Sequence, residues 1–171
     1  MFRLSPGWSG LHSFVVPFPI ILLLVAPLLV IVGATATAAK RRVFLESALT
    51  LMVLGTGMTY LAFATGKLAT KGIVPTPGLS DLLKDHWCLA ESTLELFSGL
   101  TLGFAALLFL SKLLGRDLES GVRTALFAAF LVFYGIGAVL LIDTTLRGGH
   151  LAHVLGTKTA VTCNLPNKEG R

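Results

Sequence analysis

Four long apolar stretches constrain the fold of this chain more than any other feature. A helix needs about 20 apolar residues to cross the hydrocarbon core of a bilayer, and each stretch reaches that length. The stretches cover residues 13–39, 43–66, 87–110 and 122–146. Only 13% of the residues are charged, whereas a soluble domain carries about 25%. The sequence therefore predicts an all-α, polytopic membrane protein and excludes a water-soluble or disordered chain.

The connectors between these stretches predict how the helices are arranged. The first and third connectors are short, which predicts two hairpins and a four-helix antiparallel bundle over 13–147. The second connector, 67–86, is rich in glycine and proline and predicts a turn-rich loop. Pro27 predicts a kink in the first helix. Residues 1–12 form an external N-terminal segment, and 148–171 form a polar external tail without helical periodicity.

Basic residues predict the orientation of the chain. Lys40, Arg41 and Arg42 follow the first span with no acid among them, and positive charges close to a span favour the cytoplasmic side. We therefore expect the two short connectors in the cytoplasm, and both termini and the 67–86 connector on the periplasmic side. The basic residues form no stripe, so they favour contacts with lipid headgroups over nucleic acid.

All four histidines fall on one membrane face in this topology. His12 precedes the first span, His86 opens the third, and His150 and His153 follow the fourth. Imidazole ligates haem iron without a covalent tether, and bundle interiors hold such cofactors. The pattern predicts a site for haem b, with His12 and His86 as the preferred iron ligands and His150 or His153 able to replace either. The alternative is that the histidines hydrogen-bond to water and headgroups at the interface.

Two carboxylates lie inside the third span. Glu91 and Glu95 share one helix face, about one and two turns from His86. Acidic residues at that depth are rare unless they face a bundle interior or a wet cavity. They are candidates for a proton relay or a quinone contact. The alternative places Glu91 at the headgroup level and a structural hydrogen bond from Glu95 to a serine, a threonine or Tyr60.

The cysteines and glycines predict structure rather than chemistry. Cys88 and Cys163 share the periplasmic face, where a disulfide persists; two free thiols are the alternative. Gly99 and Gly103 form a GxxxG pair, which is typical of close helix contact. The sequence contains no CxxC, GxSxG, HExxH, Walker or dinucleotide motif. It therefore specifies no enzyme, and a non-catalytic subunit is the simpler interpretation.

Three short motifs resemble a known family. The run 11–20, LHSFVVPFPI, is similar to the "HP..VHFPI" opening of the bacterial four-helix membrane family known as domain of unknown function 2231. Ala64-Thr65-Gly66 resembles the "TG" that ends the second helix of that family, and 146–151, LRGGHL, resembles its "GG.LVY.HG" tail. The chain departs from the family at two histidine positions, which are Pro17 and Leu155 here.

The resemblance implies a redox setting in the bacterial inner membrane, because members of the family occur beside cytochrome c and Rieske-type modules. We therefore expect an electron-transfer subunit that holds haem b near the periplasmic face and passes electrons between a periplasmic cytochrome and a quinone or partner haem. Two alternatives stay open at this point. One is a cofactor-free accessory subunit of a large membrane complex, which the two missing histidines would favour. The other is a small ion or solute carrier built around Glu91 and Glu95.

Overall fold

The computed structural model describes residues 7–71, 77–113 and 120–163, with side chains over 7–71, 78–109 and 121–153. These residues form helices and no strand: α1 (Trp8–Val15), α2 (Pro17–Thr35), α3 (Ala38–Thr70), α4 (Pro77–Leu113) and α5 (Ser120–Cys163). Four spans are long and apolar enough to cross a membrane, namely Trp8–Thr35, Ala38–Thr70, Gly78–Phe109 and Gly121–His153. The predicted all-α, four-helix membrane fold is confirmed.

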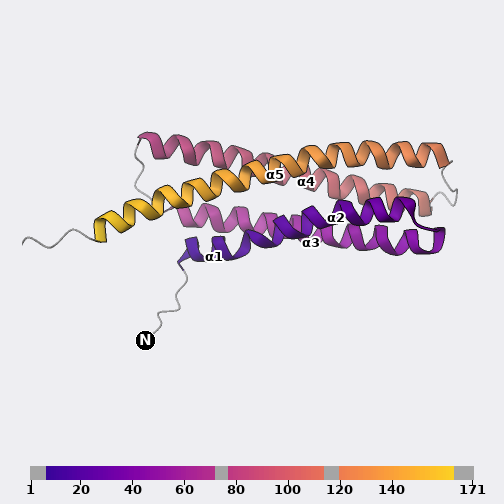
Figure 1. Cartoon of the computed structure of the whole chain (residues 1–171), viewed down its shortest axis with the longest axis horizontal. Helices are drawn as coiled ribbons and strands as arrows, with labels where there is room; N and C mark the ends of the chain where they lie inside the picture. Colours follow the sequence, from indigo (N-terminus) through magenta and orange to yellow (C-terminus); the bar gives the residue numbers. More distant parts are fainter. Residues whose placement is uncertain (1–6, 72–76, 114–119, 164–171) are drawn as a thin grey trace, which may run out of the picture.

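The helices form an elongated antiparallel bundle (Figure 1). Helix α3 packs along both α1 and α2, α4 packs along α5, and the two pairs meet through α3 with α4 and α2 with α5. The start of α1, the end of α3, the start of α4 and the end of α5 lie at the same end of the bundle (Figure 1). We call this the histidine end, because it carries His12 and His86.

Most helix ends lie beyond the predicted apolar stretches, although α2 ends at Thr35 and not at residue 39. Helix α4 begins at Pro77, inside the predicted loop, and α5 continues to Cys163, through most of the predicted irregular tail. Pro77 is the first helical residue, a position where the missing N–H of proline has no intrahelical partner to lose. Gly148 and Gly149 each cost about 1 kcal/mol in a helix, but extending an existing helix needs no new nucleation. Hydropathy therefore indicates which part of each helix is long and apolar enough to cross a membrane, and it does not indicate where the helix begins and ends.

Pro27 lies inside α2 and creates the main polar contact of the core. Proline has no N–H to bond the carbonyl four residues before it, which is that of Leu23. The hydroxyl of Tyr134 on α5 donates a hydrogen bond of 2.7 Å to this Leu23 carbonyl. Tyr134 is only 1% exposed. The carbonyl that Pro27 leaves without an intrahelical donor therefore accepts a buried hydrogen bond that connects the two hairpins.

The core repeats at helical spacing along each helix. Its buried apolar side chains are Leu23, Ala26 and Val30 of α2, Leu45, Ala48 and Met52 of α3, Phe97 and Phe104 of α4, and Phe130, Tyr134 and Leu141 of α5. Steps of three, four and seven residues place each set on one face of its helix. Threonine pairs add hydrogen bonds of 2.9 Å across helices, between Thr56 and Thr101 and between Thr93 and Thr144. The interior is therefore tightly packed, with polar ties between hydroxyl groups.

Some glycines lie where two helices are in close contact, and others lie on helix surfaces that no described residue covers. A Cβ atom on Gly55 would lie 2.7 Å from the Leu23 side chain, and one on Gly137 would lie 3.3 Å from Phe97. A Cβ atom on Gly99 or Gly103, by contrast, would have no other atom of the described residues within 4 Å. The close contact that the GxxxG pair predicts is therefore not made within the described part of this chain.

Candidate functional site

His12 is held in one orientation on α1 by the facing helix α3. Its Nδ1 lies 2.9 Å from the carbonyl of Ala62 and 3.3 Å from Oγ1 of Thr65. A carbonyl oxygen only accepts, so Nδ1 carries the proton in this hydrogen bond and Nε2 keeps its lone pair. A hydrogen bond from the second ring nitrogen to a backbone carbonyl is also the usual way that proteins orient a metal-binding histidine.

The His12 ring packs directly on a glycine. A Cβ atom on Gly66 would lie 3.1 Å from Cε1 of His12. A side chain at this position would require the imidazole to shift by a few tenths of an ångström. Gly66 lies one residue beyond Thr65, so the same turn of α3 supplies both the hydrogen bond and the space for the ring.

His86 occupies a matching position in the second hairpin. It lies on α4 and packs on Gly148 of α5, where a Cβ atom would lie 2.9 Å from its Cε1. The ring also interacts with the backbone of Thr144. Each hairpin thus places one histidine against a glycine on its second long helix, at the histidine end of the bundle.

The Nδ1 atom of His86 has no partner among the described residues. It is buried and makes no hydrogen bond to any of them. Leaving a buried polar atom unpaired costs about 1–3 kcal/mol, and such an atom needs a physical explanation in a folded protein. Its neighbour His12 lies close enough to interact with it electrostatically. Two imidazoles from different hairpins, each with a nitrogen available, are a donor set that could ligate a haem iron.

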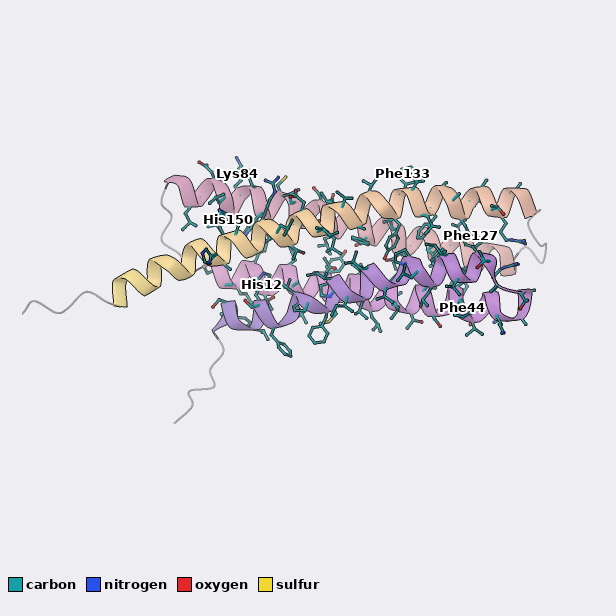
Figure 2. All side chains as sticks on the ribbon, in the orientation of Figure 1. His12, Phe44, Lys84, Phe127, Phe133 and His150 are labelled. Atoms are coloured by element: carbon teal, nitrogen blue, oxygen red, sulfur yellow. The ribbon has the colours of Figure 1, made fainter. Side chains whose placement is uncertain are left out.

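The other two predicted ligands lie on α5. His150 and His153 are both exposed on α5, and Figure 2 shows His150 on α5 and His12 on α1. Because α5 is helical here, the two side chains lie about one turn apart on the same helix. No group of three or more histidine, cysteine or acidic side chains that could hold a metal ion occurs in the described part of the chain. Iron already held by a porphyrin needs only two protein ligands.

The carboxylates of α4 lie away from the histidine pair. Glu91 and Glu95 are both exposed on the outer surface of the helix. Tyr60 forms a hydrogen bond of 3.2 Å to Ser98, not to Glu95. Glu95 instead lines a groove between α4 and α5. Their roles in a proton relay or quinone contact remain predictions.

The predicted disulfide also remains a prediction. Cys88 is an exposed, free thiol on α4, and the side chain of Cys163 lies outside the described residues. Its backbone ends α5.

Lys67 and Trp87 connect α3 to α4 beside the histidine pair. Lys67 Nζ lies 4.6 Å from the centre of the Phe63 ring and 5.6 Å from that of Trp87, distances at which a cation is attracted to an aromatic face. Tryptophan and lysine are typical of the membrane–water boundary. The histidine pair therefore lies at the level where the hydrocarbon region gives way to headgroups.

The residues that support the histidines are not among those predicted from the sequence. Gly66 and Gly148 are visible there as glycines near the predicted ends of the second and fourth spans, at the depth of the histidines. That shared depth is one available signal, and the other is that both glycines lie in the short motifs that carry the family resemblance. The sequence does not indicate that Ala62 and Thr144 contact the histidines through their backbones, because any residue supplies a backbone carbonyl.

Comparisons with protein-family models, curated proteins and solved structures found no match to this chain. The resemblance to the four-helix family therefore stays a prediction.

Proposed function

We propose that this chain is a membrane-embedded electron-transfer subunit that holds a b-type haem between His12 and His86. The observation that carries the proposal is the pair itself: two glycine-backed imidazoles from different hairpins, one with its Nδ1–H engaged and one with a buried Nδ1 that no described residue pairs. When bound, a b-type haem supplies reversible one-electron transfer at its iron.

The residues of the chain orient the two rings and limit the access of water. The carbonyl of Ala62 accepts a hydrogen bond from Nδ1–H of His12, so in the neutral ring Nε2 carries the lone pair that binds a metal. Gly66 and Gly148 allow both rings to lie against the helices. Lys67 and Trp87 cover the same level of the bundle. Together they favour a fixed site at the membrane boundary, within reach of a water-soluble electron carrier.

The direction of electron transfer rests on the resemblance and on the basic residues. Both favour a bacterial inner membrane with the histidine end facing the periplasm. The proposed partners are then a cytochrome c or Rieske-type protein on that side, and a quinone or a second haem within the membrane.

A reduced-minus-oxidised visible spectrum tests the proposal. The full chain is purified in mild detergent from membranes of a haem-sufficient host, together with His12→Ala, His86→Ala and His150→Ala. We expect the α band of a b-type haem in the unmodified chain, and its loss in the first two variants, because each removes one of the two histidines that would hold the haem.

His150→Ala is the matched control, since this exposed histidine lies outside the pair, and it should keep the band. A chain without the band, purified with or without added haem, would contradict the proposal and favour a cofactor-free accessory subunit. Retention of the band in His12→Ala and His86→Ala would show that other residues hold the haem.

A further inference from the structure

Thr65 is a buried threonine of α3 whose hydroxyl proton is directed to its own helix. Its Oγ1 lies 2.9 Å from the carbonyl oxygen of Leu61 and 3.0 Å from that of Ala62, and the residue is 3% exposed. A hydroxyl group has one proton and two lone pairs. Because the proton is shared between these two carbonyls, the lone pairs of Oγ1 remain available to accept a hydrogen bond from another residue.

His12 supplies this hydrogen bond. Its Nδ1 lies 3.3 Å from Oγ1 of Thr65 and 2.9 Å from the carbonyl oxygen of Ala62. Both oxygens act as acceptors here, so a lone pair on Nδ1 would face two other lone pairs. The Nδ1–H group therefore donates to both oxygens, and the hydroxyl of Thr65 is a second acceptor beside the backbone carbonyl.

His86 makes no matching contact with a threonine hydroxyl in the described part of the chain. Its Nδ1 has no hydrogen-bond partner there. The backbone of Thr144 interacts with the His86 ring, but the Thr144 hydroxyl lies 2.8 Å from the carbonyl oxygen of Leu140 and 2.9 Å from the hydroxyl of Thr93. The two histidines therefore differ, because a side-chain acceptor supports His12 and not His86.

We propose that Thr65 is a positioning residue that sets the electron-donating strength of His12 and thereby lowers the reduction potential of the haem. The inference rests on the proposed function, in which Nε2 of His12 contacts the iron. An acceptor on the second ring nitrogen increases the basicity of a metal-binding imidazole, and such hydrogen bonds are one of the means by which a protein tunes a haem. A more basic ligand stabilises the oxidised iron, so the potential falls.

The burial of Thr65 makes this contribution specific to its hydroxyl group. Water reaches a 3% exposed side chain poorly, so solvent does not replace the acceptor when the hydroxyl is removed. A hydrogen bond is also electrostatically stronger in a low-dielectric interior than in water. Thr65→Val, which has a similar shape and no acceptor, therefore removes the hydrogen bond with little change in packing.

Redox titration of the haem-loaded full chain in detergent tests the proposal through the midpoint potential. In Thr65→Val we expect the equilibrium constant for haem reduction to rise by about tenfold, which corresponds to a potential about 59 mV higher for one electron. Thr65→Ser keeps the hydroxyl group and should restore the potential of the unmodified chain. An unchanged potential in Thr65→Val, or a Thr65→Ser chain that behaves like Thr65→Val, would overturn the proposal.

Thr59→Val is the matched control. Thr59 is also a buried threonine of α3, and its hydroxyl donates to the carbonyl of Gly55. No hydrogen bond joins it to a histidine among the described residues. This variant should keep the potential of the unmodified chain. A shift as large as that of Thr65→Val would contradict the proposal, because the loss of any buried hydroxyl would then explain both.

Nitrogen-15 NMR of the histidine-labelled full chain without haem tests the hydrogen bond by itself, with His12→Ala to assign the His12 ring. We expect the neutral His12 ring to carry its proton on Nδ1, because Ala62 and Thr65 both accept there. A proton on Nε2 would overturn the inference even in a chain that binds haem. Absence of the b-type band would instead contradict the proposed function, and the inference with it, whichever nitrogen carries the proton.

Discussion

Each histidine of the pair depends on a neighbouring residue that has no side chain. Gly148 lies under the His86 ring, whereas a Cβ atom on Gly149, the next residue of α5, would have no other described atom within 4 Å. The two glycines carry the same conformational penalty in the helix but differ in what a methyl group would meet. Substitutions at these two glycines therefore distinguish the effect of helix propensity on stability from the effect of contact with the His86 ring.

This difference predicts opposite outcomes for two adjacent alanine substitutions. Gly149→Ala should stabilise the chain by up to about 1 kcal/mol, because alanine is the better helix former. Gly148→Ala should give less, since its methyl group would lie 2.9 Å from His86 Cε1 and the ring must move. Thermal unfolding followed by circular dichroism in detergent measures both. Equal stabilisation would show that the His86 ring is not held against Gly148.

The two helical hairpins are joined by a proline and a tyrosine. Pro27 lacks the N–H that would bond the Leu23 carbonyl, and Tyr134 supplies the missing donor from α5. Tyr134 also packs edge-on against Phe97, with ring centres 5.4 Å apart. The Tyr134 hydroxyl therefore supplies a hydrogen-bond donor to the one carbonyl of α2 that Pro27 leaves unpaired, at the centre of the core.

Tyr134→Phe should destabilise the bundle by about 1–3 kcal/mol, because it leaves the Leu23 carbonyl buried without a donor. In a Pro27→Ala background the cost should be smaller, since the new N–H of residue 27 can bond that carbonyl within α2. A double-mutant cycle on unfolding measures this coupling. Tyr60→Phe, at a tyrosine that is 54% exposed, is the control. Additive effects of the two core substitutions would refute the link.

The antiparallel bundle as a whole carries both histidines of the pair at one end (Figure 1). The basic residues 40–42 lie at the opposite end, where α3 begins. Under the proposed function, a haem at the histidine end would exchange electrons only with soluble carriers on its own side of the membrane. Orientation therefore decides which soluble partner the histidine end can meet.

Labelling of single cysteines by a membrane-impermeant maleimide measures this orientation in intact cells. In a chain with Cys88→Ser and Cys163→Ser, Lys84→Cys should react before the membrane is opened, because we expect the histidine end to face the periplasm. Arg41→Cys should react only after permeabilisation. The reverse pattern would place the histidine end in the cytoplasm and exclude a periplasmic electron carrier.

Much of this architecture could be predicted from residue order. Apolar length predicts the four spans, because only a helix satisfies its own backbone within lipid. Alternation of the spans then places His12 and His86 on one face. The helix ends at Pro77 and Cys163 could not be predicted in the same way, because outside the hydrocarbon a helix needs no apolar side chains.

Residue order alone is enough to predict the membrane class, the number of spans and the location of the histidines on one shared membrane face. Packing between the helices decides which histidines pair, that Gly66 and Gly148 support them, and that Glu95 faces outward. Lipid-facing and buried surfaces of a transmembrane helix are both apolar, so hydropathy does not reveal how a helix is rotated. Rotation is set by contacts between segments far apart in the chain, such as the hydrogen bond from Tyr134 to Leu23.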